Sequence, residues 1–366
     1  MKFTIDRELL LKPLQQVIGV VERRQTLPVL GNLLLSADSK SLKVTATDLE
    51  VEIQSRANVD IDEPGDITLP ARKLVDICKA LPENAAIQFA INDDKAQIRS
   101  GKSRFSLTTL PASDFPQVDV IKGDASFSIP QRQLKELIER TQFSMAQQDV
   151  RYYLNGLMLE ISKGLLRAVA TDGHRLALCD MPVDIKLSEP RQVIVPRKGI
   201  QELQRLLESN DDTVQVDIGT NHICITGPDI RFTSKLVDGR FPDYDRVVPK
   251  GGDKLVTADR DLLRQALSRT SILSNEKYRG IRLNLDKNIL KIQAHNPEQE
   301  EANEEFEVDY SGASLEIGFN VTYLLDVLAS VRSDNVEITL SDPNSSCLLT
   351  EPGSQQYRYV VMPMRL

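Results

Sequence analysis

Apolar and polar positions alternate along many short segments of this chain, and the clearest segments recur at a fixed interval. Leu42 to Ala46, Leu166 to Ala170 and Leu290 to Ala294 all alternate with a period of two, which is typical of β-strands with one buried face. Each starts 124 residues after the one before, and the first two continue as Ala-Thr-Asp. The pattern indicates a threefold internal repeat, with copies long enough to be domains.

Helical periodicity occurs twice in each copy. Leu134, Leu137 and Ile138 make an i, i+3, i+4 stripe behind Pro130, a residue suited to a helix start. A second helix is expected from Leu74 to Leu81, ended by Pro82. The first helix of the other copies is expected from Arg7 to Val17, where the interior Pro13 weakens the prediction, and from Asp261 to Leu267. The second helix of the other copies is expected from Pro196 onward, where Gly199 weakens the prediction, and from Val321 to Leu328, with Asn320 as N-cap.

These elements predict an α+β fold of three repeated domains, each with two helices packed on antiparallel sheets. Phe105, Phe232 and Tyr359 are spaced by 127 residues, so the copies differ only by small loop insertions. Glycine and charged residues gather at 122–124 and 250–253. We therefore expect domains at 1–124, 125–251 and 252–366.

Composition narrows the class of protein. The 366 residues are 41% hydrophobic and 27% charged, as in a soluble globular protein. No apolar run approaches the roughly 20 residues of a membrane span, and the start lacks a signal-peptide core, so we expect a cytoplasmic protein with no membrane partner. Cys78, Cys179, Cys224 and Cys347 lack metal-ligand spacing and are expected to be reduced core thiols.

The residues 171–176 form the strongest candidate for chemistry. Asp172 and His174 suit an acid/base pair, with Thr171 as nucleophile. The alternative, which we favour, is a turn in which Asp172 caps its own backbone and Gly173 adopts a positive φ. The chain has neither phosphate-binding glycine motif, neither HExxH nor GxSxG, and only three histidines, so we expect no cofactor and no metal.

Charge is distributed unevenly along the chain, whose formal net charge is −8. Basic residues gather on the predicted helices, so a shared helical surface can be positive and attract phosphates without regard to sequence. The basic positions are Arg7, Lys12, Arg23, Arg24, Arg72, Lys73, Lys79, Arg132, Lys135, Arg140, Arg197, Lys198, Arg205, Arg260, Arg264 and Arg269.

An acidic run near the third copy's Ala294 has three interpretations. Its members are Glu298, Glu300, Glu301, Glu304 and Glu305. It suits a solvated loop, or a cation site that lacks EF-hand spacing, or one half of a complementary surface. The basic half would be Lys73, Lys95, Arg99, Lys102 and Arg104, around an apolar centre of Phe105, Leu107, Ile272 and Leu273. Opposite charges at the two ends of one chain favour head-to-tail pairing, although a core role for the apolar residues stays open.

Several long motifs resemble those of one family. They are residues 143–156, the 170–176 stretch, residues 234–244 around Gly239-Arg240-Phe241-Pro242, and the end Val360-Val361-Met362-Pro363-Met364-Arg365-Leu366. Together they resemble the bacterial sliding clamp, the beta subunit of DNA polymerase III. The resemblance covers the whole chain and implies a ring-shaped head-to-tail homodimer around duplex DNA, with helices lining the hole and sheets outside.

The resemblance also implies roles for particular residues. The DNA-contacting set is Arg24, Arg72, Gln148, Tyr152 and Tyr153, to which we add Arg197 and Lys198. The cleft for partner peptides is Leu154, Thr171, Gly173, His174, Arg175, Leu176, Pro242, Arg246, Val247, Val360, Met362, Pro363, Met364 and Arg365. The dimer interface is Lys73, Arg104, Phe105, Leu107, Ile272, Leu273, Glu298, Glu300, Glu301 and Glu304. Lys95 stands where the family pattern leads us to expect arginine.

The sequence therefore predicts a non-enzymatic clamp that tethers the replicative polymerase to its template. The implied partners are double-stranded DNA, a second copy of the chain, and the replicative polymerase, clamp loader, repair polymerases, mismatch repair proteins and ligase, all docked through short peptides. The alternatives are a DNA-modifying hydrolase that uses Asp172 and His174, and a pure protein scaffold.

Overall fold

The computed structural model describes residues 1–22, 27–92, 94–116, 118, 125–185, 187 and 189–365. The first copy contains β1 (Lys2–Asp6), α1 (Arg7–Val17), η1 (Ile18–Val20), η2 (Pro28–Gly31), β2 (Asn32–Asp38), β3 (Ser41–Thr47), β4 (Val51–Asn58), β5 (Ile61–Glu63), β6 (Gly65–Pro70), α2 (Ala71–Ala80), β7 (Ala86–Asn92), β8 (Lys95–Ser100), β9 (Ser103–Thr108) and η3 (Ala112–Asp114).

The other two copies repeat this order, except that within their described residues no strand corresponds to β5. The central copy contains β10 (Ala125–Pro130), α3 (Gln131–Glu139), η4 (Gln142–Ser144), η5 (Tyr152–Leu154), β11 (Gly156–Ser162), β12 (Leu165–Thr171), β13 (Arg175–Pro182), β14 (Arg191–Pro196), α4 (Arg197–Leu206), β15 (Thr213–Ile218), β16 (His222–Thr226), β17 (Ile230–Lys235) and η6 (Tyr244–Arg246). The third contains β18 (Lys254–Asp259), α5 (Arg260–Thr270), η7 (Ser271–Leu273), β19 (Gly280–Asp286), β20 (Ile289–His295), β21 (Glu301–Glu307), β22 (Leu315–Asn320), α6 (Val321–Ser330), β23 (Asn335–Leu340), β24 (Cys347–Thr350) and β25 (Tyr357–Val361).

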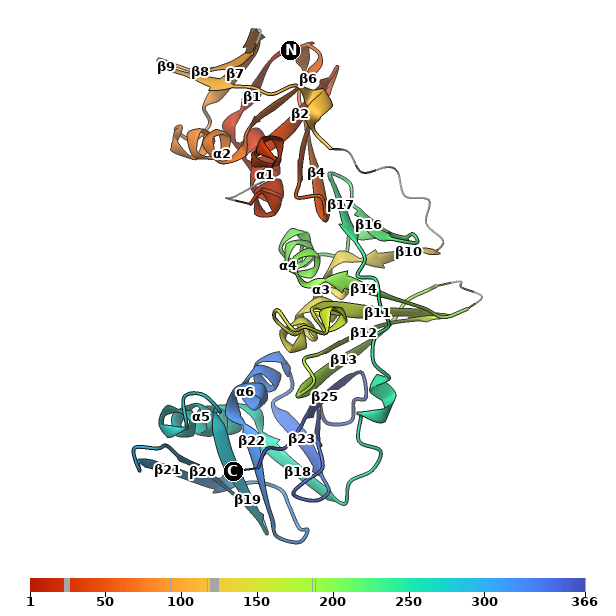
Figure 1. The fold of residues 1–366 in the computed structure, drawn as a ribbon, viewed down its shortest axis with the longest axis vertical. Coiled ribbons are helices and arrows are strands. Elements are labelled where there is room, and N and C mark those ends of the chain that lie inside the picture. The colour runs from red at the N-terminus through yellow and green to blue at the C-terminus, as the bar shows by residue number, and fades with distance from the viewer. Residues whose placement is uncertain are drawn as a thin grey trace. The chain divides into compact units, whose positions relative to one another are not determined.

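Each of two eight-stranded antiparallel sheets contains strands from two neighbouring copies (Figure 1). The chain forms two compact units, and each unit contains one of these sheets. One unit, Met1–Arg132 with Lys198–Leu236, holds the sheet β5-β1-β7-β8-β9 and the eight-stranded sheet β10-β15-β16-β17-β4-β3-β2-β6. The other, Gln133–Arg197 with Val237–Leu366, holds β14-β11-β12-β13-β25-β24-β23-β18 and β21-β20-β19-β22. In each eight-stranded sheet, one strand pair joins two copies: β17 with β4, and β25 with β13.

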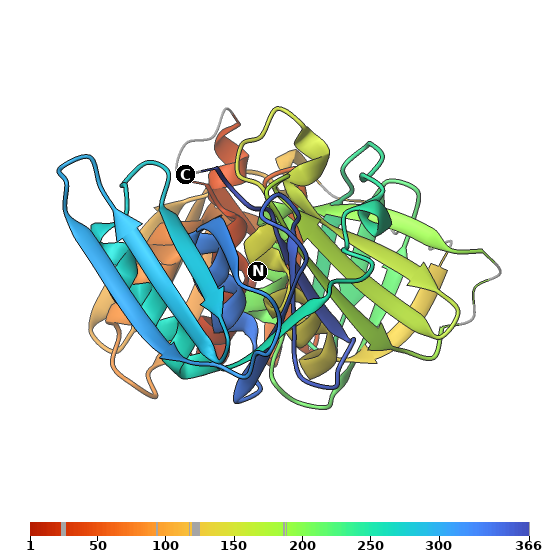
Figure 2. The ribbon, with the colours of Figure 1, turned by 90° about the horizontal axis from the view of Figure 1, so that it is seen from below.

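Helices cover one face of the sheets, as the sequence predicts. In the first copy, α1 and α2 lie together against the strands (Figure 1), and in the third copy α5 and α6 lie against the sheet of β19 and β20 (Figure 2). Strand β20 shows the alternation that produces this layering, because Leu290, Ile292 and Ala294 are buried while Lys291 and Gln293 between them are exposed.

Helix α1 forms over Arg7–Val17 although it contains Pro13. Proline removes one helical hydrogen bond, and the carbonyl that loses its donor belongs to Leu9, an exposed residue in the first half of the helix. Leu10, Leu14 and Val17 are completely buried on the opposite face. Burial of this face therefore outweighs a helix-interior cost of about 3 kcal/mol.

The solvated-loop interpretation of the acidic run is wrong for most of it. Glu301, Glu304 and Glu305 lie in strand β21, which pairs with β20 from Ile289 to His295. Alternate members of β21 are exposed and half-buried, so charged residues here occupy an edge strand with one open face.

The four cysteines are free and buried, as expected for reduced core thiols. Burial raises the pKa of Cys78, Cys179 and Cys347 to about 12. These thiols are therefore protonated and unreactive near neutral pH. No helix in the described part of the chain is long and apolar enough to span a membrane.

Glu52 is a buried carboxylate on β4, opposite Thr233 of β17, and is only 3% exposed. Its oxygens accept hydrogen bonds from Gln54 Nε2 at 2.9 Å and from the Val118 amide at 3.3 Å. Burial raises the pKa of Glu52, and these two hydrogen bonds oppose the shift without cancelling it. The charged form is thus disfavoured in the folded state.

We expect Glu52→Gln to change how stability depends on pH. A carboxyl whose pKa is raised by folding contributes its stability below its unfolded pKa of about 4.3, and loses it as pH rises through the folded pKa. The free energy of unfolding of the two proteins should therefore be similar at pH 4 and diverge by pH 8 in favour of the glutamine variant. Urea titrations across that range measure the difference, and parallel curves would contradict the assignment.

Candidate functional site

The turn between β12 and β13 is built by its own side chains. Asp172 Oδ1 accepts hydrogen bonds from the amides of His174 (2.9 Å) and Arg175 (3.0 Å), and Thr171 Oγ1 donates to the Arg175 carbonyl (2.6 Å). Gly173 has a φ of +88°, and a Cβ there would lie 3.0 Å from the guanidinium of Arg151. The predicted capped turn is confirmed, and glycine is required at its centre.

Arg175 extends from this turn and is held on every side. Its Nε donates to Asp172 at 3.0 Å, its Nη2 donates to the Phe143 carbonyl at 2.7 Å, and its Nη1 pairs with Asp326. The guanidinium carbon lies 4.6 Å from the ring centre of Tyr323 on α6, a cation–π contact. Arg175 therefore fixes the β13 turn to a helix of the third copy.

The acid/base hypothesis for Asp172 and His174 is not supported by this geometry. Both oxygens of Asp172 are occupied, one by the turn amides and the other by Arg175. His174 is exposed and its ring stacks on Tyr323 with centroids 6.4 Å apart. A carboxylate committed to its own turn cannot orient an imidazole as a general base.

An apolar surface lies beside the turn. Leu154, Leu176 and Val360 belong to one hydrophobic cluster, and the half-buried Val247 packs against it. Strand pairing places Leu176 directly opposite Val360 across β13 and β25. The structure thus brings together four residues of the predicted cleft from segments up to 206 positions apart in the chain.

The carboxyl-terminal tail forms one side of this surface. The Met362 amide donates to the His174 carbonyl and the Met364 amide to the Gly318 carbonyl of β22, each at 2.9 Å. Met362 is 37% exposed, and Pro363 and Met364 are half-buried. Backbone bonds therefore hold the tail while leaving its apolar side chains open to a ligand. Beyond it, Met364 and Arg365 line a hollow of about 430 Å³ with Tyr278 and His295.

The remaining predicted cleft residues stand at the rim. Pro242 and Arg246 are exposed, and Arg246 Nε pairs with Asp243 at 2.8 Å. Sequence reasoning missed Tyr323, Phe143 and Asp326, which hold Arg175. The apolar periodicity of the sequence did predict helix α6, which contains Tyr323 and Asp326. Periodicity does not indicate that this helix packs against the turn between β12 and β13.

The predicted DNA-contacting residues have different surroundings. Arg24 lies outside the described residues. Arg72 is exposed on α2, and its Nη2 donates to the Val21 carbonyl at 2.9 Å. Gln148 is exposed with a φ of +53°. Tyr152 is 57% exposed, whereas Tyr153 is half-buried against the cleft cluster, so one tyrosine faces solvent and the other the core.

The two added cations are partly engaged within the chain. Arg197 Nη1 donates to the Met145 carbonyl at 2.9 Å, and burial lowers the pKa of Arg197. Lys198 Nζ pairs with Glu22 at 2.7 Å and with Asp48 at 2.5 Å. Burial alone would lower the pKa of Lys198, but these hydrogen bonds raise it. Lys198 is thus charged, with much of its charge neutralised locally.

Arg140 cannot belong to an exposed basic surface, contrary to our expectation. It is 3% exposed, and its Nη1 donates to Glu351 at 2.7 Å while the guanidinium lies 4.0 Å from the ring centre of Tyr357. The position just after α3 faces inward, so Arg140 stabilises the packing of this unit instead of facing a ligand.

Two sheet edges carry the predicted interface residues. Strand β9, with Arg104, Phe105 and Leu107, ends one sheet, and β21, with Glu301 and Glu304, ends another. Phe105 is half-buried, Leu107 is buried, and Ile272 in η7 is 75% exposed. Glu304 pairs with Arg269 at 2.6 Å, whereas Lys73 is exposed on α2. Leu273 is half-buried beside Ile272, and Glu298 and Glu300 are exposed just before β21.

Three repeated domains joined edge to edge, with an apolar cleft and no catalytic group assembled among the described residues, define a DNA clamp fold. The chain belongs to the DNA polymerase III beta subunit family, the bacterial sliding clamps. Models of its N-terminal, central and C-terminal domains match residues 1–119, 128–243 and 245–365.

Curated relatives and solved structures match the whole chain. The beta sliding clamps of Pseudomonas putida and Escherichia coli are 60% and 56% identical to it, with 100% of each chain covered. A crystal structure of the DNA polymerase III subunit beta from Pseudomonas aeruginosa is 59% identical with a TM-score of 0.98. A solved structure of pol III beta from Caulobacter crescentus is 41% identical with a TM-score of 0.94, and both pairs of chains are fully covered.

The family membership establishes the function. The chain is a DNA sliding clamp, a non-catalytic processivity subunit of DNA polymerase III, and the hydrolase alternative is set aside. Its fold is that of the three-domain clamps, consistent with a ring-shaped dimer. Across the described residues, no group of three or more histidine, cysteine, aspartate or glutamate side chains is placed to hold a metal ion.

Proposed function

We propose that two chains close a ring by pairing β9 of one with β21 of the other. Inside the chain, successive copies join by one rule, since β17 pairs antiparallel with β4 and β25 with β13. The equivalent strands are β9 and β21, because β9 corresponds to β17 and β25, and β21 to β4 and β13. Each ends its sheet, and its outer edge pairs with no other strand among the described residues. In two chains the rule is used four times internally, and two further uses, one at each junction between the chains, would complete a closed ring of six domains.

The internal pairs also suggest a register for this contact. Phe232 lies opposite Ile53, and Tyr359 opposite Ala177. Phe105 of β9 is equivalent to Phe232 and Tyr359, at intervals of 127 residues. Glu301 of β21 is equivalent to Ile53 and Ala177, at intervals of 124 residues. With Phe105 opposite Glu301, Lys102 falls opposite Glu304, so cation meets carboxylate across the edge.

The proposed interface residues support this arrangement. Phe105, Leu107, Ile272 and Leu273 would supply its apolar centre, and Ile272 is too exposed in the free chain for a core role. Lys73 and Arg104 would face the acidic set of Glu298, Glu300, Glu301 and Glu304.

The cleft beside the 171–176 turn is proposed to receive short peptides from the replicative polymerase, clamp loader, repair polymerases, mismatch repair proteins and ligase. Its floor is the apolar cluster of Leu154, Leu176 and Val360. Two methionines of the tail suit varied apolar ligands, because thioethers are flexible and polarisable. A similar structure, the Pseudomonas aeruginosa clamp, is bound to griselimycin, which supports a ligand site in this family.

Duplex DNA is proposed to pass through the ring on the helical side, contacted by Arg24, Arg72, Gln148, Tyr152, Tyr153, Arg197 and Lys198. Long-range attraction to phosphates does not depend on sequence and permits sliding. Closure of the ring retains DNA topologically, so tight binding is unnecessary. We place this activity in the cytoplasm, and the domain boundaries at 1–124, 125–251 and 252–366.

The observation that supports the proposed ring is the antiparallel pairing of edge strands that joins successive copies, β17 with β4 and β25 with β13. Retention of the protein on DNA tests whether the ring closes. Protein loaded by a clamp loader on nicked circular DNA should stay bound through gel filtration and run off once the circle is cut. The His174→Ala variant should be retained equally, because His174 lies in the turn before β13 and belongs to neither β9 nor β21. Retention on linear DNA would contradict a topological ring, and loss of retention in the variant would contradict this separation of roles.

A further inference from the structure

The segment that runs from β17 to β18 supplies one side of the proposed peptide cleft, through Pro242, Arg246 and Val247, which we call the linker side. Pro242 and Arg246 are exposed, and Val247 is half-buried. Connecting segments are more mobile than the strands they join unless side chains fix them. The shape of the linker side therefore depends on what holds this segment against the sheet.

Tyr244 anchors the segment. It is 5% exposed, and its ring packs in the hydrophobic cluster that also contains Leu176 and Val360. Its carbonyl accepts hydrogen bonds from the amides of Val247 at 2.9 Å and of Val248 at 3.2 Å. Tyr244 thus joins the floor of the cleft to the part of the segment that contains Val247.

The hydroxyl of Tyr244 is held from two sides. It donates to Glu160 Oε2 at 2.9 Å and accepts from Arg167 Nη1 at 3.1 Å. Arg167 also donates two hydrogen bonds to Asp180, which accepts a further one from Arg358 Nη2 at 2.6 Å. These four charged residues stand on neighbouring strands, β11, β12, β13 and β25, and their charges alternate in sign. The phenol is therefore fixed by a row of charges that spans the central and third copies.

The protonation state of Tyr244 suits this role. Burial raises the pKa of Tyr244 to about 12, so the hydroxyl keeps its proton near neutral pH and stays a donor to Glu160. Hydrogen bonds to ionised partners are stronger than those between neutral groups. The anchor is therefore present over the whole physiological pH range.

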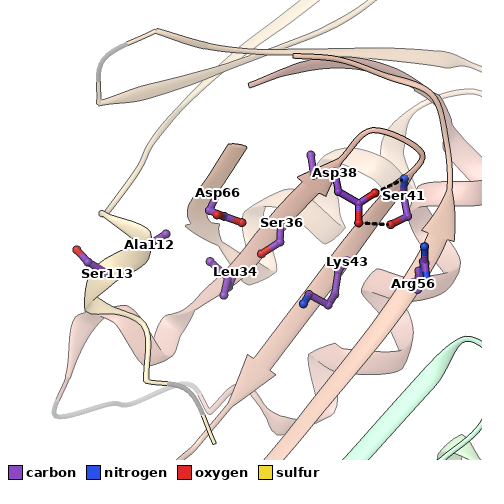
Figure 3. A pocket seen from close by; sticks show the side chains of 10 residues that line it. Leu34, Ser36, Asp38, Ser41, Lys43, Arg56, Asp66, Ala112 and Ser113 are labelled. Atoms are coloured by element: carbon purple, nitrogen blue, oxygen red, sulfur yellow. Dashed lines mark hydrogen bonds between the residues drawn. The ribbon is translucent and has the colours of Figure 1, made fainter. Parts of the chain in front are cut away.

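The first copy has the same place on its sheet without the tyrosine. The positions 124 residues before Glu160, Arg167 and Asp180 are Ser36, Lys43 and Arg56. They line a pocket of about 640 Å³ (Figure 3). Val118 stands where Tyr244 does, by the Phe-Pro dipeptide at 115–116 and 241–242. The tyrosine and both carboxylates thus belong to the copy that contains the linker side, and the first copy has none of them at the equivalent positions.

We propose that Tyr244 is a positioning residue of the peptide cleft, and that its hydroxyl bonds to Glu160 and Arg167 hold the linker side in the shape that a partner peptide meets. This inference rests on the proposed peptide-binding function of the cleft. A surface that is already ordered loses little entropy when a peptide binds, whereas a loose one must be ordered at that moment. Releasing the hydroxyl should therefore reduce peptide affinity.

Calorimetry on the full-length protein tests this, with a synthetic peptide copied from the clamp-binding segment of the replicative polymerase. Tyr244→Phe removes only the hydroxyl and should weaken binding at least fivefold. Tyr310→Phe is the matched control, because Tyr310 is 1% exposed, its hydroxyl donates to the Ala313 carbonyl, and it is none of the proposed cleft residues. It should also lose stability, but it should bind the peptide like the parent.

Two further measurements separate positioning from stability alone. In free Tyr244→Phe the amides of Val247 and Val248 should exchange hydrogen faster than in the parent, and saturating peptide should restore their protection. Glu160→Gln keeps an oxygen that can accept from the Tyr244 hydroxyl, so it should recover most of the affinity lost in Glu160→Ala.

The outcomes distinguish this inference from the proposed function. If the parent binds the peptide and removal of Met364 to Leu366 weakens binding, parent-like affinity in Tyr244→Phe overturns the positioning role and leaves the cleft in place. Equal weakening in Tyr310→Phe, or unchanged exchange at Val247 and Val248, also overturns it, because the effect would then be general destabilisation. A parent that does not bind the peptide overturns the proposed cleft and this inference together.

Discussion

Ile272→Ala/Leu273→Ala should elute as a monomer at micromolar concentration and lose all retention on circular DNA. Ile272 is 75% exposed in the single chain and lies beside the edge strand β21. Truncating a buried Ile or Leu to Ala costs about 2 kcal/mol or more, so both together weaken each interface by roughly a thousandfold. A ring of two identical chains has two such interfaces, and because both chains carry the double substitution, both interfaces are weakened.

A matched variant separates interface loss from general loss of apolar surface. Leu255 and Leu262 are 51% and 54% exposed in the same copy but lie on β18 and in the first turn of α5. Leu255→Ala/Leu262→Ala should stay dimeric. Sedimentation velocity measures both proteins, and a persistent dimer of the Ile272/Leu273 variant would place the interface elsewhere.

The repeat made much of the fold predictable from sequence. A strand such as β3 reveals itself by local alternation, and α2 by a stripe that Pro82 ends, so each copy predicts the others. The turn at Gly173 was also predictable, because Asp172 and glycine act within five residues of chain. The strands, helices and turns whose conformation depends on residues close by in the sequence were therefore the parts of the fold that could be predicted.

Features decided by distant segments were missed. The pairing of β17 with β4 joins strands about 180 residues apart, and nothing in either strand's own pattern specifies the other. Arg140 follows a helix whose other cations are exposed (Arg132) or half-buried (Lys135), and only the presence of Glu351 and Tyr357 explains its full burial. The loop interpretation of the acidic run failed because the four glutamates of β21 mask a period-two pattern, and the strand depends on pairing with β20 for its stability.

The candidate site was predictable only in part, for the same reason. Leu176 and Val360 are apolar residues like many others until β13 and β25 pair and set them side by side. The resemblance to a family supplied that juxtaposition in advance. It did not supply Tyr323, which touches both His174 and Arg175 and so helps to hold the wall of the cleft.

Removing Met364 to Leu366 should weaken binding of a polymerase clamp-binding peptide by roughly tenfold to a hundredfold. The deletion should leave the dimer intact. The deletion removes a half-buried methionine from the cleft side, and full burial of such a side chain is worth about 1.5–3 kcal/mol. It also removes the Met364 amide bond to Gly318, which holds the tail in place beside β22. The tail follows β25 of the third copy, lies beside the cleft at the 171–176 turn, and includes no residue of β9, β21 or η7.

Arg365→Ala is the matched variant, because it shortens the exposed end of the tail and keeps Met364 with its backbone bond. It should bind the peptide within a few-fold of the parent by calorimetry, since an exposed charge contributes little. The contrast between the two variants assigns the loss to the apolar wall and its anchorage. Unchanged affinity after the deletion would exclude the tail from the peptide site, and a monomeric deletion variant would mean that the cleft and the dimer edge depend on each other.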